Sequence, residues 1–204
     1  MAKNVFTKIT SPRGAALYPF LKTPEVYEGQ EVGYTIQAMF SKEDTDRIIE
    51  ALEKELDKAK KSDSFKGKKW SRDPHMGYRE NKDGDIVFKF KTKATVKTRS
   101  GEEVKRTVPV FDAKGNSIDV AIGNGSIVRI AFQVVPFHKS STLNGVTLFL
   151  DAVQVIELVE YGGNNNNANA FGFDEEEGYT SDNVANQFDD EEEEVGNASN
   201  EVDF

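Results

Sequence analysis

The sequence contains no cysteine, only two histidines and a single tryptophan, and it has no long hydrophobic run. Without cysteine, neither a disulfide framework nor a thiolate zinc site can form. No stretch approaches the roughly 18 apolar residues of a membrane-spanning helix, and residues 1–10 lack the apolar centre of a signal peptide. These absences favour a soluble protein of a reducing compartment, with no membrane association.

Catalytic signatures are absent as well. The sequence has no HExxH motif, no GxxxxGK[ST] phosphate loop and no GxSxG nucleophile motif. His75 and His138 are best interpreted as solvated surface residues, and Gly123-Asn124-Gly125 as a turn. We therefore expect a protein that is not an enzyme, with no catalytic residue, no metal ion and no cofactor.

The charge is divided unequally along the chain. The net charge is -9, but residues 162–204 hold thirteen carboxylates and no lysine or arginine, whereas residues 1–161 hold 22 acidic and 26 basic residues. A mildly basic body joined to a strongly acidic tail points to a nucleic-acid partner and an acidic interaction segment.

The character of the chain changes at Gly162. Glycines, an asparagine run and acidic clusters follow, and such a composition cannot bury enough apolar surface to offset the entropy of ordering. We expect residues 1–161 to form one domain and residues 162–204 a disordered acidic tail. Aromatic residues scattered among the acids indicate an interaction segment.

The body contains one clear helix, expected from about Lys42 to Lys60. Ser41 is placed to cap it, and Asp44 follows three residues later. Apolar residues then recur at helical spacing: Ile48, Ile49, Leu52 and Leu56. A polar loop with several aromatic residues follows over 61–84, a length that is often functional.

The rest of the body predicts β-strands. Strands are expected over Ile86 to Lys97, Val104 to Phe111, Ile127 to Val135 and Val146 to Val159, and Pro109 places the second of them at a sheet edge. Several short strands, glycine-rich turns and one helix predict a mainly β fold, a small Greek-key barrel of the OB type.

Cations and flat side chains occur together, as binding of a single nucleic-acid strand requires. In the strand from residue 86 to 97 the period of two places Phe88 and Phe90 on one face and lysines on the other. The candidate cations are Lys89, Lys91 and Lys93, with Lys105 and Arg106 from the return strand and with Arg129 and Lys139. The alternative interpretation is a solvated edge that blocks aggregation between strands.

Some aromatic residues are candidates for stacking and others for the core. Phe88, Phe90, Phe132 and Phe149 are expected in the core. The candidate stacking platforms are Trp70, Tyr78 and Phe137, with Tyr18 as a further option. Phe137 follows Pro136 at a strand end, which is an awkward place for a core residue.

The acidic tail strengthens the nucleic-acid interpretation. A polyanion on the same chain as a cationic groove occupies that groove at high effective concentration, and both DNA and salt compete with it. Displacement releases the tail to meet other proteins. Asp203 and Phe204 then offer a partner an aromatic ring and carboxylates.

Several segments resemble the single-stranded DNA-binding proteins of tailed bacteriophages with a compact, podophage type of replication machinery. They are residues 1–7, residues 83–85 followed by Phe88-Lys89-Phe90-Lys91, residues 134–139, and the acidic tail ending in residues 203–204. The resemblance covers most of the chain but is patchy over residues 10–84. Where that family has a tyrosine, this chain has Phe137.

The resemblance implies an OB-fold that coats single-stranded DNA without strong sequence preference in phage DNA replication, recombination and repair, in the cytoplasm of the infected bacterial host. It assigns DNA binding to Lys3, Lys89, Lys91 and Phe137, and partner binding to Phe204. It also implies tail contacts with the phage DNA polymerase and helicase-primase, and some formation of homodimers. An RNA-binding OB module, a protein-interaction factor with a DNA-mimicking tail and a nuclease are the alternatives.

Overall fold

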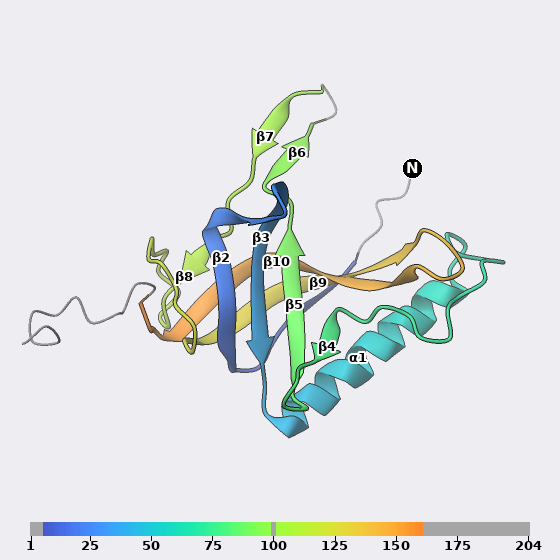
Figure 1. The fold of residues 1–204 in the computed structure, drawn as a ribbon, viewed down its shortest axis with the longest axis horizontal. Helices are drawn as coiled ribbons and strands as arrows, with labels where there is room; N and C mark the ends of the chain where they lie inside the picture. The colour runs from blue at the N-terminus through green and yellow to red at the C-terminus, as the bar shows by residue number, and fades with distance from the viewer. Residues whose placement is uncertain (1–5, 99–100, 161–204) are drawn as a thin grey trace, which may run out of the picture. The chain divides into compact units, whose positions relative to one another are not determined.

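The computed structural model describes residues 6–98 and 101–160, so the expected tail over residues 162–204 lies outside the described residues (Figure 1). In chain order the elements are β1 (Thr7–Thr10), β2 (Gly14–Tyr27), β3 (Gln30–Met39), α1 (Lys42–Lys61), β4 (Tyr78–Glu80), β5 (Ile86–Thr92), β6 (Thr95–Lys97), β7 (Glu103–Lys105), β8 (Val110–Phe111), β9 (Ile127–His138) and β10 (Asn144–Glu157).

Five of these strands close into a barrel. β2 pairs with β3, β3 with β5, β5 with β10, β10 with β9, and β9 returns to pair with β2. The β5–β10 pairing is parallel and the other four are antiparallel. Closure removes unpaired strand edges, and this arrangement confirms the expected OB-type barrel.

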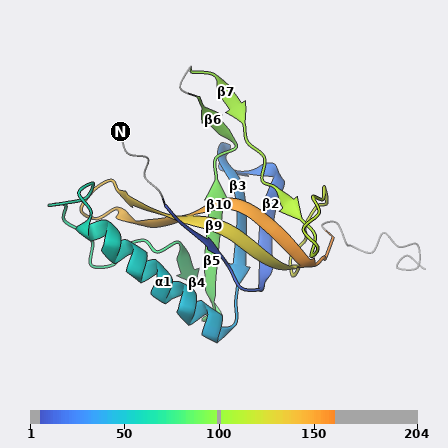
Figure 2. The same ribbon diagram turned by 180° about the vertical axis from the view of Figure 1, so that it is seen from behind.

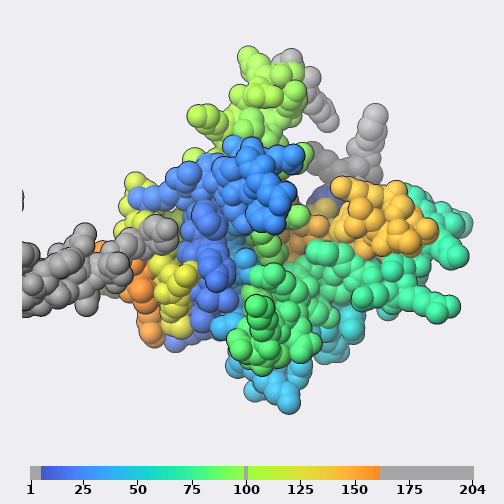
Figure 3. Space-filling view, in the orientation of Figure 1, coloured from blue at the N-terminus to red at the C-terminus, as the bar shows by residue number. Residues whose placement is uncertain are grey.

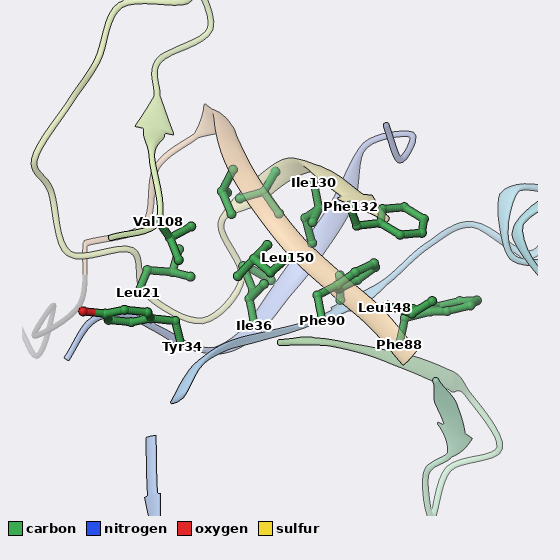
Figure 4. Packing of buried hydrophobic residues seen from close by; sticks show 14 of the residues in the cluster. Leu21, Tyr34, Ile36, Phe88, Phe90, Val108, Ile130, Phe132, Leu148 and Leu150 are labelled. Carbon is green, nitrogen blue, oxygen red and sulfur yellow. The ribbon is translucent and has the colours of Figure 1, made fainter. Parts of the chain in front are cut away.

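Strand alternation fills the barrel with large apolar side chains. Phe88 and Phe90 of β5 are fully buried, and Phe132 of β9 meets Phe90 with ring centroids 4.9 Å apart. Figure 4 shows these three rings packed with Ile130 and Leu148. Three of the four aromatic residues expected in the core are therefore confirmed.

Along the chain, α1 comes between β3 and β5, which are the second and third strands of the barrel. It begins where the sequence predicts. The hydroxyl of Ser41 accepts a hydrogen bond from the backbone N–H of Asp44 at 3.2 Å, which satisfies one of the free donors of the first turn. Its apolar stripe of Ile48, Leu52 and Leu56 joins the core, and α1 packs against β9 and β10 (Figure 2). No helix among residues 6–98 and 101–160 is long and apolar enough to cross a membrane.

The hairpin expected from the strands over residues 86–97 and 104–111 is confirmed around its turn, where β6 and β7 pair antiparallel, but neither of its strands is continuous. β5 stays paired with β3 only as far as Thr92, opposite Tyr34, and beyond that point it has no partner in the barrel. The chain leaves there as a separate two-stranded sheet of β6 and β7, which projects from the barrel in Figure 1. β8 then returns to pair with β10 at the sheet edge, directly after Pro109.

A short bridge inserts between β5 and β10 at one end of the barrel. His75 pairs with Gly145: the N–H of His75 donates to Asn144 at 2.9 Å, and the N–H of Val146 donates to the carbonyl of His75 at 2.7 Å. Gly145 has φ 143° and lies so close to the backbone of His75 that an added Cβ would overlap it. Glycine is required here because any side chain would displace the bridge.

Candidate nucleic-acid interface

Two of the predicted lysines share the outer face of the barrel. Lys89 and Lys91 lie on β5, opposite Gln37 and Thr35 of β3, with their side chains pointing away from the core. Lys93 lies beyond the last residue of β5, where the chain leaves the barrel. The expected stripe of three lysines on one strand is thus reduced to two.

An open groove of about 550 Å³ lies beside Lys89. It is on the face shown in Figure 3, between the β2–β3 hairpin and the segment around β4. Its polar and aromatic lining comes from four regions of the chain: Glu25, Tyr27, Gln37, His75, Tyr78, Arg79 and Lys89. In an OB-fold this is the face of the second and third barrel strands, which binds oligonucleotides and oligosaccharides.

A carboxylate that the sequence did not reveal lies within this groove. Glu25 forms an ion pair with Lys89, with 3.0 Å between Oε2 and Nζ, and accepts a hydrogen bond from the hydroxyl of Thr35 at 2.8 Å. Burial raises the pKa of Glu25, but the hydrogen bonds from Thr35 and Lys89 and the charges of Lys89 and Lys91 outweigh burial and hold the pKa below its ordinary value. Glu25 therefore stays ionised and neutralises much of the charge of Lys89.

An aromatic pair lies near the other side of the groove. Phe137 is on β9 opposite Gly145, and its ring centroid is 6.0 Å from that of His75, which lines the groove. Lys139 is exposed in the turn that joins β9 to β10, two residues beyond Phe137. The structure thus brings Phe137 and Lys139 to the same side of the barrel as Lys89.

The other two predicted platforms are partly enclosed. Tyr78 lies opposite Phe88, with ring centroids 5.4 Å apart, and its pKa is raised by burial and by the charges of Glu53 and Asp73. Its ring therefore packs toward the core, although it reaches the groove lining. Trp70 is half-buried and meets His138 edge-on at 5.2 Å. Phe137 is half-buried to a similar degree, so burial alone does not rank the three rings as stacking platforms.

The structure does not bring Arg129 to this surface. Arg129 and Phe137 are eight residues apart on β9, which corresponds to roughly 26 Å along an extended strand. Arg129 instead lines a separate cavity of about 270 Å³ together with Gln154. Lys3, Asp203 and Phe204 lie outside the described residues.

Phe149 is the fourth aromatic residue expected in the core, and that expectation is wrong. It is half-buried on the outer face, opposite Lys91, and the guanidinium carbon of Arg106 lies 4.9 Å from its ring centroid. The signal was present in the sequence, because the period of two groups Phe149 with Thr147 and Asp151 rather than with Leu148.

Phe149 belongs to a line of side chains that crosses the sheet, which we call the transverse row. Each member is the direct cross-strand partner of the next, so all six share one face. From β1 to β2 the members are Lys8, Gln133, Phe149, Lys91, Thr35 and Phe20. Cations and aromatic rings alternate with polar groups along this row.

Among the described residues, no group of three or more His, Cys, Asp or Glu side chains could hold a metal ion. The arrangement offers positive charge, hydrogen-bonding groups and aromatic rings on one outer face. Such a surface can track a phosphate backbone and stack bases, and it needs no bond-breaking chemistry.

Comparison with known proteins agrees with this description. Residues 26–158 match the family described as single-stranded DNA-binding protein, bacteriophage T7. Single-stranded DNA-binding proteins of enterobacteria phage T3 and Escherichia phage T7 are 33% and 32% identical to this chain over 92 residues. That stretch covers 43% of this chain but only 40% of either relative.

Solved structures show the same fold. The crystal structure of gp2.5, a single-stranded DNA-binding protein of bacteriophage T7, matches with a TM-score of 0.62 at 23% identity, over 87% of this chain and all of that one. The bacteriophage Enc34 protein in complex with single-stranded DNA matches with a TM-score of 0.55 at 14% identity, over 79% of this chain and 97% of that one. The family is named for binding and not for a reaction, in agreement with the expectation that the chain is not an enzyme. Because the family match extends over more than half of its length, the chain belongs to the bacteriophage T7 family of single-stranded DNA-binding proteins.

Proposed function

We propose that this chain binds single-stranded DNA across the outer face of its barrel, without strong sequence preference. The observation that carries this proposal is that Lys91 lies beside Phe149, while Lys89 lines the same groove as His75, whose ring contacts Phe137. Lysines there can neutralise phosphates, and the rings can stack any base because every base has a π-face. The Enc34 relative, which shares the fold, has been solved with single-stranded DNA.

The finer roles are part of the same proposal. The chain coats and protects single-stranded DNA during phage replication, recombination and repair, in the cytoplasm of the infected bacterium. Residues 162–204 compete with DNA for the cationic face, and on release Asp203 and Phe204 contact the phage DNA polymerase and helicase-primase. Homodimer formation and DNA-binding roles for Lys3, Lys93, Arg129, Trp70 and Tyr78 remain predictions.

The direct test is binding to single-stranded DNA, double-stranded DNA and single-stranded RNA of equal length across a salt series. The full chain is compared with a chain ending at Gly163, where the compact first unit ends. We expect preference for single-stranded DNA and tighter binding by the shortened chain, because its polyanionic competitor is gone. Weaker binding by the shortened chain contradicts the competitor role. Preference for RNA favours the RNA-binding alternative, and no binding at all favours a protein-interaction factor.

Replacing Glu25 by glutamine is expected to tighten binding to oligo-dT about two- to fivefold. The change removes the carboxylate that pairs with Lys89, and a partly exposed ion pair of this kind contributes roughly 0.2 to 1 kcal/mol. Fluorescence anisotropy at low and high salt measures the change. Glu50→Gln is the matched control, because Glu50 pairs with Lys54 at 2.6 Å on the exposed face of α1.

The same pair gives a pH dependence of stability. Because the folded-state pKa of Glu25 is depressed, its stabilising contribution is present above the unfolded-state pKa and is lost as pH falls through the folded-state value. The difference in free energy of unfolding between the wild type and Glu25→Gln should therefore shrink on acidification. A difference that stays constant through this range contradicts the assignment of the ion pair.

A further inference from the structure

Tyr18 has a backbone conformation that tyrosine rarely adopts. Its φ is 47°, in the left-handed region, and the residue is 56% exposed. A bulky residue at positive φ is an outlier that costs on the order of 1–3 kcal/mol and persists only where the surroundings impose it. Burial does not explain the choice of tyrosine, since more than half of the residue is exposed.

A β-bulge turns this ring outward. Leu17 pairs with Gln37 and Phe20 pairs with Thr35, so β2 has one residue more than β3 between these two pairings. Leu17 shares the outer face of Gln37, and unbroken alternation would therefore direct Tyr18 into the core. The extra residue and the positive φ place Tyr18 on the outside together with Phe20, which is 40% exposed.

Asn124 holds the bulge in place. Its side-chain oxygen accepts a hydrogen bond from the backbone N–H of Tyr18 at 2.6 Å. The same turn is tied to β2 by two backbone bonds, from Gly125 N–H to the Ala16 carbonyl and from Ala16 N–H to the Ser126 carbonyl, both at 2.8 Å. The turn therefore fixes the direction of a strained, exposed ring.

That ring lies on the same face as the lysines of β5. On one side of the bulge Leu17 pairs with Gln37, which in turn pairs with Lys89. On the other side Phe20 pairs with Thr35, which in turn pairs with Lys91. Two strand spacings separate β2 from β5, which is roughly 10 Å. A polynucleotide that crosses the strands over the lysines reaches Tyr18 on β2 as it reaches Phe149 on β10.

We propose that Tyr18 is a stacking platform for a base of the bound DNA, and that Asn124 is the residue that positions it. This inference rests on the proposed function and extends the binding track to the first barrel strand. The occupant is a single-stranded polynucleotide, because the lysines two strands away, above all the exposed Lys91, favour an anion and the exposed ring favours a flat apolar surface.

The test measures the affinity of the full chain for oligo-dT of increasing length, from about 4 to 16 nucleotides, the site sizes known for OB-folds. Tyr18→Gly removes the ring and accommodates the positive φ, so the melting temperature should be equal to or above that of the wild type. We expect this variant to bind the longer oligonucleotides at least about fivefold more weakly and the shortest ones normally. Tyr18→Phe keeps the ring and should bind as the wild type does.

Asn124→Ala should also weaken binding, and combining it with Tyr18→Gly should produce no further loss, because the asparagine acts only through the ring. If Tyr18→Gly binds every length as the wild type does, or if the losses from the two changes simply add, the inference is overturned while the proposed function stands. A wild-type chain that binds no oligonucleotide overturns both.

Discussion

Replacing Lys89 and Lys91 together by glutamine should weaken binding to oligo-dT by about 10- to 25-fold in 0.1 M salt. For single strands the logarithm of affinity falls by about 0.7 per phosphate contact for each tenfold rise in salt, so two contacts are worth roughly 25-fold at this concentration. The lower limit reflects the pairing of Lys89 with Glu25, which already neutralises part of its charge. A salt titration should show a slope reduced by roughly 1.4 and a difference that vanishes toward 1 M salt.

The matched control is the double change of Lys54 and Lys58 to glutamine. It alters the net charge by the same amount, but both lysines lie on α1 and pair with helix carboxylates, Glu50 and Glu55. Thermal unfolding shows whether each variant is folded. Equal weakening by the two double changes would mean that net charge, and not the lysine pair on β5, governs binding.

Replacing Gly145 by alanine should lower the free energy of unfolding by about 3–5 kcal/mol, the sum of overpacking and backbone strain. The new Cβ would overlap the carbonyl of His75 and lie 2.6 Å and 2.7 Å from its backbone nitrogen and carbonyl carbon. These atoms cannot move aside without breaking the hydrogen bonds of the bridge to Asn144 and Val146. Chemical denaturation measures the loss, and DNA binding should fall as well because His75 adjoins Phe137.

Gly115→Ala separates the two causes. Gly115 also has a positive φ, 88°, but no atom lies within 4 Å of an added Cβ. It should cost only the strain of the left-handed conformation, about 1–2 kcal/mol. If both variants lose the same stability, the close approach between Gly145 and His75 is not what demands glycine.

The elements that the sequence predicted correctly are those specified by local pattern. The capped, amphipathic helix ends one residue beyond its expected end, and β9 and β10 follow runs of β-branched residues. Phe137 was correctly placed at a strand end, and Lys89 and Lys91 on a solvent face. In each case a period of 3.6 or 2 within one segment carries the information.

The missed features depend on which strands meet. The strand pattern of residues 86–97 continues past Thr92, but nothing local reveals that β3 stops pairing there and that β5 ends before Lys93. Glu25 reaches Lys89 from a segment 64 residues away, through irregular pairing of β2 with β3. The sequence indicates Tyr18 only through its aromatic ring, because the bulge that exposes it depends on the pairing of β2 with β3.

The transverse row takes one side chain from each of six strands, from Lys8 on β1 to Phe20 on β2. A ligand lying along it would touch segments that are remote in sequence and joined only by backbone pairing, although Thr35 on β3 is itself buried and bonded to Glu25. A slip of one residue in the pairing of any of these strands would point its side chain in the row toward the interior of the barrel. Recognition therefore cannot survive local unfolding of a barrel strand, and occupancy of the row should link the whole barrel into a single cooperative unit that opens together or not at all.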